Sequence, residues 1–378
     1  MRRCSVLQIV ASSRGGGAEV VRCLVKGLDS SRFESTVAMP DDGGQLDAAD
    51  FERVGARCLY FDIASGFSVR ECLRLRRFVR KGGFDIIHCH GARAALWGRL
   101  AAIGPRRPKT IFAVHGLSLV HHRTVKRTPL LFLNRALQSS TDITLCDSDR
   151  EAADVIRHGI APAERVEVVQ NGVDLDRFDQ SLYPRSEARS ALALDDKRPL
   201  VVTVCRLDRP RDFHTLLRAM KYVVAELPLV KLLIVGGGPY RQAIEEQVRE
   251  LNLEQSVQLL GTVRDVARIL AAADAFVLAT QGWEGLPLAP LEAQAMGLPV
   301  VISDVGSNRL AVQDGVTGLV VAPRQVEALA DALVRLLADP LVCQQMGQLG
   351  RIRVVDEFSA QRMARDTVRV YRRLVHAC

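Results

Sequence analysis

Short apolar runs alternate along the chain with longer segments in which apolar residues recur every three or four positions. The short runs predict buried parallel strands, and the longer segments predict helices that cover them. In the first half we expect strands at Val6–Ala11, Ser35–Met39, Arg57–Phe61, Asp85–Cys89, Thr110–Val114, Ile143–Cys146 and Val166–Val169. Helices are expected at Ala18–Leu28, Gln45–Val54, Val69–Lys81, Ala92–Ile103, Thr128–Ser139 and Asp149–His158. This alternation predicts an α/β domain with helices on both faces of a parallel sheet.

The alternation stops at a polar segment and then restarts. Residues 176–198 hold Pro184 and few strand-forming residues, so we expect a linker there between a first domain, 1–175, and a second, 199–360. Strands of the second domain are predicted at Leu200–Val204, Lys231–Val235, Val257–Leu260, Ala275–Ala279, Val300–Ser303 and Gly318–Val321. Helices are predicted at Phe213–Glu226, Tyr240–Leu251 and Val263–Ala272, with three more from Gln325 to the end. The chain is therefore expected to hold two doubly wound Rossmann-like domains, with a cleft between the carboxyl ends of their strands.

Composition narrows the function classes. With 378 residues, 48% of them hydrophobic, the chain is long enough for two cores. It lacks an uninterrupted apolar run of membrane-spanning length, and no cleavage-type region follows the first strand, so we expect a cytoplasmic protein. The nine cysteines are scattered without metal-ligand spacing, and we expect buried reduced thiols.

The net charge of +8 is uneven. Residues 1–180 hold 27 Lys and Arg against 21 Asp and Glu, and six of these cations lie on one predicted helix: Arg70, Arg74, Arg76, Arg77, Arg80 and Lys81. A second basic group, Arg123, Lys126 and Arg127, follows later. We hypothesise that the first domain rests on the anionic inner face of the cell membrane; a solvated helix face is the alternative. No nucleic-acid motif is present, and only 5% of residues are aromatic, so no nucleic acid is expected as a partner.

Two carboxylates mark the candidate site. Glu284 and Glu292 are eight residues apart, and Gly285 and Pro287 between them predict a turn that starts a helix. Glu284 is then in a loop at the carboxyl end of a strand, and Glu292 is on the helix. The free N–H groups of such a helix start suit a phosphate or a sugar oxygen.

Three other motifs need interpretation. Gly15-Gly16-Gly17 follows the first strand, but its spacing is not that of a dinucleotide fingerprint. Asp147-Ser148-Asp149 has the form of a metal-binding DxD, yet Ser148 and Glu151 form a capping box that explains it without a metal. His88 and His90 are interpreted as packing or loop residues and are not assigned to the site.

Taken together, these pieces resemble glycosyltransferase family 4, a group of retaining nucleotide-sugar glycosyltransferases with the GT-B fold. The resemblance covers nearly the whole chain. It is carried by Gly16-Gly-Ala-Glu19, Asp85-Ile-Ile-His-Cys-His-Gly91, Val114-His-Gly116, Asn171-Gly-Val-Asp174, Arg206-Leu207, Gly236-Gly-Gly-Pro239, Glu284 with Glu292, and Gly315-Val-Thr-Gly318. In this family the final helix crosses back to the first domain, so residues 361–378 are expected to pack there.

The resemblance also implies roles for single residues. Glu292 would bind both ribose hydroxyls of the donor, and Glu284 would face the hydroxyls of the donor sugar. Arg206 and Arg211 would hold the diphosphate, and His115 would contact the sugar near the reacting carbon. Further donor-binding positions implied by the resemblance are Gly16, Gly17, Gly236, Gly238, Thr262, Gly285, Leu286, Pro287 and Leu288. A metal-independent front-face transfer to a glycan or lipid-linked acceptor is expected, with a UDP-sugar favoured as donor.

The chain departs from the family where Lys-Gly is usual, because it has Arg211-Asp212. Asp212 is placed to pair with Arg211 and weaken its contact with phosphate. Two other functions stay open from the sequence: a nucleotide-sugar epimerase of the same fold, and a nucleotide-sugar-binding protein without catalysis.

Overall fold

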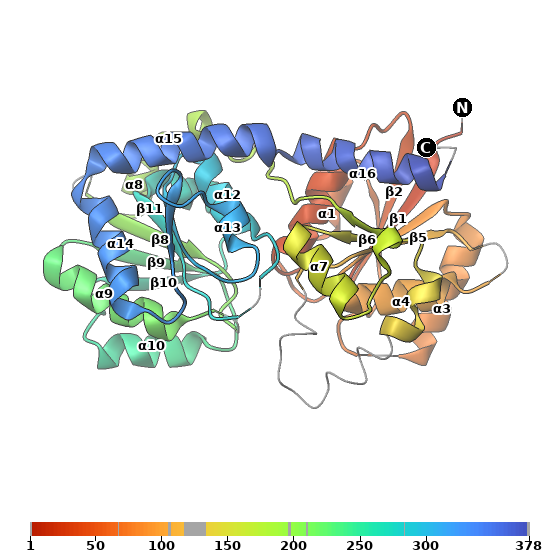
Figure 1. Ribbon diagram of the computed structural model, residues 1–378, viewed down its shortest axis with the longest axis horizontal. Helices are drawn as coiled ribbons and strands as arrows, with labels where there is room; N and C mark the ends of the chain where they lie inside the picture. Colours follow the sequence, from red (N-terminus) through yellow and green to blue (C-terminus); the bar gives the residue numbers. More distant parts are fainter. Residues whose placement is uncertain are drawn as a thin grey trace. The chain divides into compact units, whose positions relative to one another are not determined.

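The computed structural model describes residues 2–66, 68–104, 107–116, 134–195, 198–208, 211–282 and 284–375. The chain divides into two compact units, one formed by Met1–Gly172 with Ala360–Cys378 and the other by Val173–Ser359. Each unit is built on one parallel sheet covered by helices, as the alternation of apolar patterns predicts (Figure 1).

The first sheet has seven strands in the order β3-β2-β1-β4-β5-β6-β7. The strands are β1 (Cys4–Val10), β2 (Phe33–Met39), β3 (Arg57–Tyr60), β4 (Ile86–His90), β5 (Lys109–Ala113), β6 (Ile143–Cys146) and β7 (Val166–Val168). The helices of this unit are α1 (Gly16–Gly27), α2 (Ala48–Glu52), α3 (Val69–Gly82), α4 (Ala92–Ala102), α7 (Asp149–Arg157) and α16 (Ala360–Leu374). β1 pairs in parallel with β2 and β4, which places it near the middle of the sheet.

Alternate residues of β1 serve opposite faces of this sheet. Val10 joins a core cluster with residues of α1 and α2, whereas Ile9 lies against Gly98 of α4 on the other face. Figure 1 shows α1 and α16 on one side of the sheet and α3 and α4 on the other. Because both faces are covered, the inner strands are largely apolar and buried, which is why they appear in the sequence as short apolar runs.

The last helix belongs to the first unit, as the resemblance implied. α16 packs on α1, and Gly27 of α1 leaves no room for a larger side chain against Ala364. Tyr371 is completely buried, and Arg362 donates a hydrogen bond of 2.8 Å to Gln170 Oε1. The C-terminal segment therefore completes the core of the first unit.

The second sheet has six parallel strands in the order β10-β9-β8-β11-β12-β13. These are β8 (Leu200–Val204), β9 (Lys231–Val235), β10 (Val257–Gly261), β11 (Ala275–Leu278), β12 (Val300–Ser303) and β13 (Gly318–Val321). The helices are α8 (Arg185–Ala191), α9 (Phe213–Glu226), α10 (Arg241–Glu250), α11 (Val266–Ala272), α12 (Leu288–Ala295), α13 (Asn308–Ala311), α14 (Val326–Ala338) and α15 (Pro340–Glu357).

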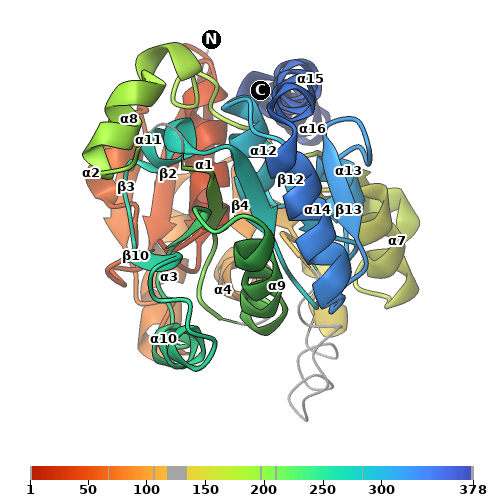
Figure 2. The ribbon, with the colours of Figure 1, turned by 90° about the vertical axis from the view of Figure 1, so that its left-hand side faces the viewer.

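Two hydrophobic clusters flank this second sheet. Val201, Ile234 and Val277 pack with residues of α9, α10 and α14, while Val202 and Phe276 pack with residues of α8, α11 and α12. In Figure 2, α9 and α10 lie on one side of the sheet and α8 and α11 on the other. Neighbouring residues of one strand thus enter opposite cores, as the pleat requires.

The segment 176–198 differs from expectation, because it is part of the second unit. Phe178, Ala188 and Leu194 are buried in one of its core clusters, and the buried Arg189 donates a hydrogen bond of 2.7 Å to Ala272 O. Widely spaced apolar residues anchor this polar segment, which is why its composition suggested a linker.

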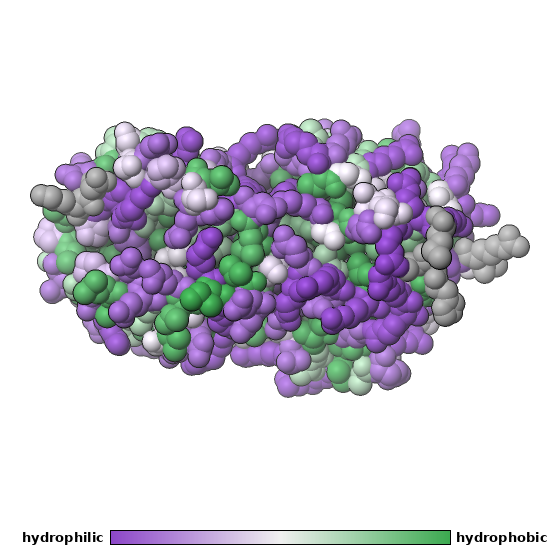
Figure 3. Space-filling model, turned by 90° about the horizontal axis from the view of Figure 1, so that it is seen from above, coloured by the Kyte–Doolittle hydropathy of each residue, from purple (hydrophilic) through white to green (hydrophobic). Residues whose placement is uncertain are grey.

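Other expectations compare with the structure as follows. Half of the helix predicted at Thr128–Ser139 lies outside the described residues; the other half is helical at 134–136 and is followed by a 3₁₀ turn at Gln138–Ser140. Seven cysteines are free thiols, but Cys4 is disulfide-bonded, so the expectation of reduced thiols is wrong at that position. In the described segments we find no helix with the length and apolarity needed to cross a bilayer. On the face shown in Figure 3, hydrophilic residues predominate and hydrophobic residues form small separate groups.

Candidate functional site

The paired glutamates lie where the sequence analysis placed them, around the start of α12. Glu284 is in the loop after β11, and Glu292 is half-buried on the helix. Pro287 is the N-cap, Leu288 is the first helical residue, and Gly297 ends the segment with a φ of +70°. Neither Pro287 nor Pro290 has an N–H group, so at this helix start Leu288 and Ala289 carry the open donors. Pro287 therefore constrains the conformation of the loop and cannot donate a backbone hydrogen bond.

Glu284 pairs with Arg211. Arg211 Nη1 donates to Glu284 Oε1, and the two side chains are only 17% and 12% exposed. Burial raises the pKa of the Glu284 carboxyl against the pull of Arg211. Burial also works to lower the pKa of Arg211, but the Glu284 carboxylate more than offsets it, and the pKa is raised. The guanidinium therefore keeps its charge at neutral pH.

Asp212 does not compete for Arg211 in the way that the sequence analysis suggested. Its carboxylate accepts hydrogen bonds from the backbone N–H of Thr215, at 3.1 Å, and from the Thr215 hydroxyl, at 2.8 Å. Asp212 is thus the N-cap of α9, with its own backbone N–H bonded to Ala279 O. The residue that stands where the family has glycine starts a helix.

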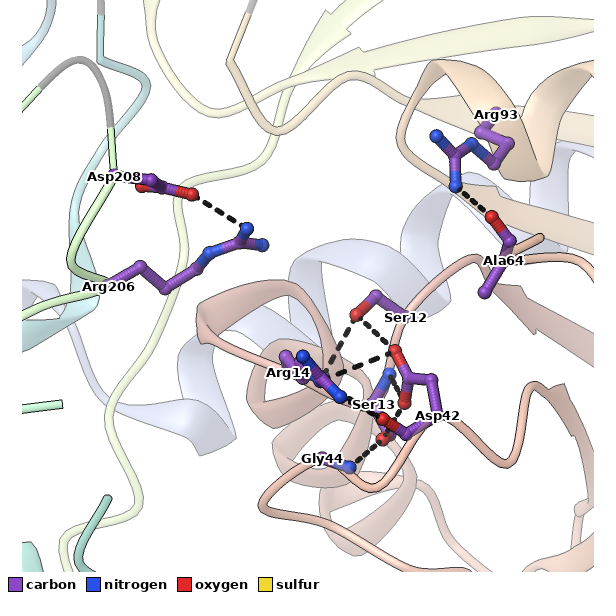
Figure 4. A network of polar contacts seen from close by, with 9 residues as sticks. All are labelled: Ser12, Ser13, Arg14, Asp42, Gly44, Ala64, Arg93, Arg206 and Asp208. Carbon is purple, nitrogen blue, oxygen red and sulfur yellow. Dashed lines mark hydrogen bonds and ion pairs between the residues drawn. The ribbon is translucent and has the colours of Figure 1, made fainter. Parts of the chain in front are cut away.

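Arg206 lies in the loop that follows β8, and its side chain is 54% exposed. Its Nη2 is 2.6 Å from Asp208 Oδ2 in the same loop (Figure 4). The loop is held by hydrogen bonds from Leu207 N to Gly237 O and from Tyr240 N to Leu207 O. An exposed pair of this kind contributes at most about 1 kcal/mol, so Arg206 can exchange Asp208 for another anion at little cost.

The glycines after β9 have a packing reason. Gly236 has a φ of +137°, and a Cβ there would collide with Cys205 O. A Cβ at Gly238 would collide with Leu207 O, and one at Gly237 would lie 2.9 Å from Thr262 Oγ1. Gly236 and Gly238 are glycine because the loop after β8 runs against them, whereas Gly237 lies against Thr262, which follows β10. The donor contacts implied for Gly236, Gly238 and Thr262 stay predictions.

The glycine loop of the first unit leads into α1. Gly15 is the N-cap with a φ of +81°, and Gly16 and Gly17 are the first two helical residues, whose N–H groups have no partner within the helix. Space is open around Gly17, where an added Cβ would meet nothing within 4 Å. Glu19 pairs with Arg22 at 2.6 Å on the same helix.

Asp42 binds Ser12 and Ser13, the residues that precede this loop. Its carboxylate accepts from the Ser12 hydroxyl at 2.8 Å and from the Ser13 backbone and hydroxyl, and Ser13 Oγ in turn accepts from Gly44 N at 3.0 Å (Figure 4). Arg14 donates to the Asp42 carbonyl. These hydrogen bonds lower the pKa of Asp42 against the effect of burial. The hydrogen bonds of Asp42 fix the chain just before the first N–H groups of α1, which have no partner within the helix.

His115 follows β5 with a φ of +52°, and it lies beside two other histidines. His90 Nδ1 is 2.9 Å from His115 Nε2, and their rings stack with an interplanar angle of 14°. His88 Nδ1 is 2.8 Å from the Tyr371 hydroxyl. Burial lowers the pKa of His115 to about 4 and that of His88 to about 3, so both are neutral at pH 7. A small pocket of about 20 Å³ opens beside the three rings.

The DxD segment supports the turn after β5. Ser148 caps α7 by accepting from Glu151 N at 3.1 Å, and the Glu151 carboxylate accepts from Gly116 N at 2.7 Å and from Asp147 N at 3.0 Å. Burial raises the pKa of Glu151 well above its ordinary value. Glu151 thus accepts hydrogen bonds from the backbone just after β5 and just after β6. Within the described residues no three His, Cys, Asp or Glu side chains lie close enough together to hold a metal ion.

Family models match both parts of the chain. A model described as Glycosyltransferase Family 4 matches residues 14–177, and one described as Glycosyl transferases group 1 matches residues 184–353. The two matches follow one another and together span most of the sequence. The chain belongs to glycosyltransferase family 4. The fold, with two Rossmann-like sheets and the last helix returning to the first unit, is that of the GT-B glycosyltransferases.

Relatives of this family 4 glycosyltransferase support the assignment. A UDP-Gal:alpha-D-GlcNAc-diphosphoundecaprenol alpha-1,3-galactosyltransferase from Escherichia coli is 27% identical over 77% of this chain and 76% of its own length. A GDP-mannose-dependent monoacylated alpha-(1-6)-phosphatidylinositol monomannoside mannosyltransferase from Corynebacterium glutamicum is 35% identical, but the match spans 51% of this chain and about half, 52%, of that relative. The solved sucrose-phosphate synthase of Thermosynechococcus elongatus aligns over 100% of both chains with a TM-score of 0.82 and 26% identity.

Sequence reasoning named Arg211 and Glu284, which the structure pairs, and His115, which the structure places beside His90. It left His88 and His90 out. His88 and His90 are two residues apart on a predicted strand, so their side chains lie on the same face of the sheet. This spacing could have indicated that both histidines contact whatever packs on that face. The partners that cover it, Gln8 and Tyr371, are far away in the sequence and carry no local signal.

Proposed function

We propose that this glycosyltransferase moves a hexose, with retention of anomeric configuration, from a UDP-sugar to a lipid-linked or glycan acceptor in bacterial surface polysaccharide or glycolipid assembly. One relative, matched over 77% of this chain, is named for UDP-Gal and a diphosphoundecaprenol-linked acceptor. Other relatives are named for GDP-mannose and phosphatidylinositol mannosides. The wider match favours a uridine nucleotide and an acceptor carried on a lipid diphosphate.

The observation that carries this proposal is the start of α12. It combines the open N–H groups of Leu288 and Ala289, the half-buried Glu292 and the buried Arg211–Glu284 pair. In the proposed donor complex Glu292 accepts hydrogen bonds from the two ribose hydroxyls. Glu284, oriented by Arg211, accepts from hydroxyl groups of the sugar. The backbone of Gly285 and Leu286 supplies further donors, while Pro287 shapes the loop.

Charge develops on the nucleoside diphosphate as the bond to the sugar breaks, and the site must stabilise it. Arg206 suits this task because its partner Asp208 is easily exchanged. Arg211 already neutralises Glu284, and its Nε is buried without a partner among the described residues, so it keeps a donor to offer. Since Glu284 is held by Arg211, we assign no covalent nucleophile and propose a front-face transfer in which His115 contacts the sugar near the reacting carbon.

The direct experiment offers the protein single donors with one acceptor. UDP-galactose, UDP-glucose and GDP-mannose are each incubated with a GlcNAc-diphosphate-lipid, and the product is examined by NMR. We expect a new glycosidic bond with one uridine donor, and an anomeric proton coupling that shows the donor's configuration. Inversion would overturn the mechanism, transfer from GDP-mannose alone would overturn the donor, and an epimerised sugar without transfer would overturn the reaction.

We further propose that α3 contacts an anionic membrane surface. Its exposed residues combine cations with apolar side chains: Val69, Arg70, Leu73, Arg74, Arg77, Arg80 and Lys81. Val69 and Leu73 are 66% and 58% exposed, and Arg74 is held by Glu71 at 2.7 Å. A helix face of this composition suits an interface with anionic headgroups, at about 1 kcal/mol for each cation near the surface. The second basic group, Arg123, Lys126 and Arg127, lies outside the described residues.

Vesicle co-sedimentation tests this contact. The variant Arg70→Gln/Arg77→Gln/Arg80→Gln/Lys81→Gln removes four exposed cations of α3. A matched control, Arg218→Gln/Lys221→Gln/Arg249→Gln/Arg335→Gln, removes four exposed cations from helices of the second unit. Binding to vesicles that contain about 30% anionic phosphatidylglycerol is expected to fall only in the α3 variant, because basic residues are attracted to a negatively charged surface. Equal binding of both variants to the vesicles, or binding that does not weaken as the salt concentration rises, would contradict the proposal.

A further inference from the structure

A line of hydrogen bonds runs through the core of the first unit from the last helix to His115. Gln8 Nε2 of β1 donates to the Tyr371 hydroxyl of α16 at 3.1 Å. Gln8 Oε1 is 2.8 Å from His90 Nε2, and His90 Nδ1 is 2.9 Å from His115 Nε2. Gln8 is completely buried and His90 is 5% exposed, so water does not compete for these bonds. The C-terminal helix is thereby joined to His115 through two buried side chains.

These bonds have a direction, because the two ends of an amide differ. Gln8 donates through Nε2 to Tyr371, which leaves Oε1 as an acceptor for an N–H group of His90. A neutral imidazole carries a single proton, so protonation of His90 at Nε2 makes its Nδ1 an acceptor. The donor to that atom is then Nε2–H of His115. In this arrangement Nδ1 of His115 carries a lone pair and no proton.

The remaining groups agree with this direction. The Tyr371 hydroxyl accepts from Gln8 and has its own proton to donate to His88 Nδ1 at 2.8 Å. Burial raises the pKa of Tyr371, so that proton is retained. Burial lowers the pKa of His90 well below its ordinary value, so neither His90 nor His115 takes a second proton at pH 7. Every proton on the line therefore has one defined position.

We propose that Gln8 and His90 are positioning residues that fix His115 with its proton on Nε2, so that Nδ1 accepts a hydrogen bond from a hydroxyl group of the transferred sugar. The inference rests on the proposed contact between His115 and the sugar. A sugar hydroxyl that donates to Nδ1 keeps its oxygen lone pairs free to accept from other donors. The line also gives hydrogen-bond partners to the hydroxyl of Tyr371, a side chain of the last helix that is completely buried in the first unit.

The test is a tautomer measurement on the full-length protein, labelled with ¹⁵N at histidine. Long-range ¹H–¹⁵N correlation at pH 7 distinguishes a protonated from an unprotonated ring nitrogen, and the His115 signals are assigned by their loss in His115→Gln. The expected spectrum has His115 protonated at Nε2 and unprotonated at Nδ1. A proton on Nδ1, or averaging between the two tautomers, would overturn the proposal even if every variant below failed to fold.

A substitution of Gln8 tests the cause. Gln8→Leu removes the oxygen that faces His90, so the His115 signals should shift toward a mixture and kcat/KM should fall by roughly twofold to tenfold, the value of about one hydrogen bond. Cys89→Ala is the matched control, because Cys89 lies between His88 and His90 on β4 but faces α4. An unchanged tautomer in Gln8→Leu, or a changed one in Cys89→Ala, would contradict the role of Gln8.

The measurement separates the two proposals. If the tautomer is as expected and His115→Gln keeps full activity, the contact with the sugar is wrong while the hydrogen-bonded line stands. If the tautomer is reversed, the line is wrong whatever the activity.

Discussion

The two units of this glycosyltransferase solve the problem of a buried polar centre in opposite ways. In the first unit, His88, His90 and His115 are held neutral by burial and joined by hydrogen bonds between uncharged groups. In the second, Arg211 and Glu284 form an ion pair whose side chains are mostly buried. Neutral groups with fixed donors and acceptors give direction, whereas a buried charge pair gives a strong field that depends on both partners. In the proposed function, the neutral groups of the first unit orient the sugar, and the charged groups of the second unit stabilise the negative charge of the diphosphate.

The largest expected effect comes from breaking the charge pair. Arg211→Met leaves Glu284 buried without its cation, and we expect the free energy of unfolding of the second unit to fall by about 3–5 kcal/mol. Arg211→Lys keeps the charge and should lose much less. Adding Glu284→Gln to Arg211→Met removes the uncompensated carboxylate and should restore most of the stability. Urea unfolding of the three variants measures this, and an unaltered stability of Arg211→Met would show that the pair is unimportant.

The next effect separates binding from chemistry in the second unit. Arg206→Ala should lower kcat by a hundredfold to a thousandfold, about 2.7–4 kcal/mol, because it removes a donor to charge that grows as the bond breaks. Its stability should change little, since the side chain is exposed. Glu292→Ala removes the proposed contact with the ribose, which would be made equally in the ground and transition states, so its effect should appear mainly in KM. Steady-state kinetics in which Arg206→Ala changes mainly KM and Glu292→Ala changes mainly kcat would contradict the roles given to these two residues.

Acid tests the neutral centre of the first unit. The pKa values of the three histidines are depressed in the folded chain, to about 4 for His115 and about 3 for His88, while the unfolded chain takes up protons near 6.5. The unfolded state then binds more protons, so stability is complete above about pH 6.5 and is lost as pH falls toward 4. Glu151, with its raised pKa, acts in the opposite sense.

A variant isolates the contribution of one histidine. His115→Gln removes one proton from the difference between the folded and unfolded states. Between about pH 6 and about pH 5, its loss of stability should therefore be smaller by about 1.4 kcal/mol per pH unit than that of the unaltered protein. Urea unfolding at a series of pH values gives both slopes. Equal slopes would mean that His115 is not held neutral.

The smallest effect concerns the departure from the family at Asp212. Asp212→Ala removes the N-cap of α9 and should cost about 1 kcal/mol of stability, whereas Asp212→Asn keeps an oxygen for Thr215 N and should cost little. Both should leave kcat/KM unchanged, because Arg211 pairs with Glu284. A rise in activity of Asp212→Asn would instead indicate that Asp212 weakens Arg211.

Most of the fold was predictable because most strands are short, largely apolar segments buried on both faces, as β1 and β8 are. The helix start between Glu284 and Glu292 was predictable for a similar reason, since glycine and proline constrain the backbone locally. The pairing of Arg211 with Glu284 was not, because it joins residues 73 positions apart across two strands. Phe178 and Leu194 are too widely spaced to mark 176–198 as part of a core. Gln8 and Tyr371 meet only when α16 packs on the first sheet, so no local pattern announces their contact with His90.

The most direct test of the account is whether the nucleotide is bound by the second unit's glutamate. Thermal unfolding of the full chain is followed with and without saturating UDP, for the unaltered protein and for Glu292→Ala and His115→Gln. A ligand that binds only the folded state raises Tm by an amount that grows with the ratio of its concentration to its Kd. The account predicts that UDP stabilises the unaltered protein and His115→Gln alike and fails to stabilise Glu292→Ala at the same concentration. Equal stabilisation of Glu292→Ala, or its loss in His115→Gln, would contradict it.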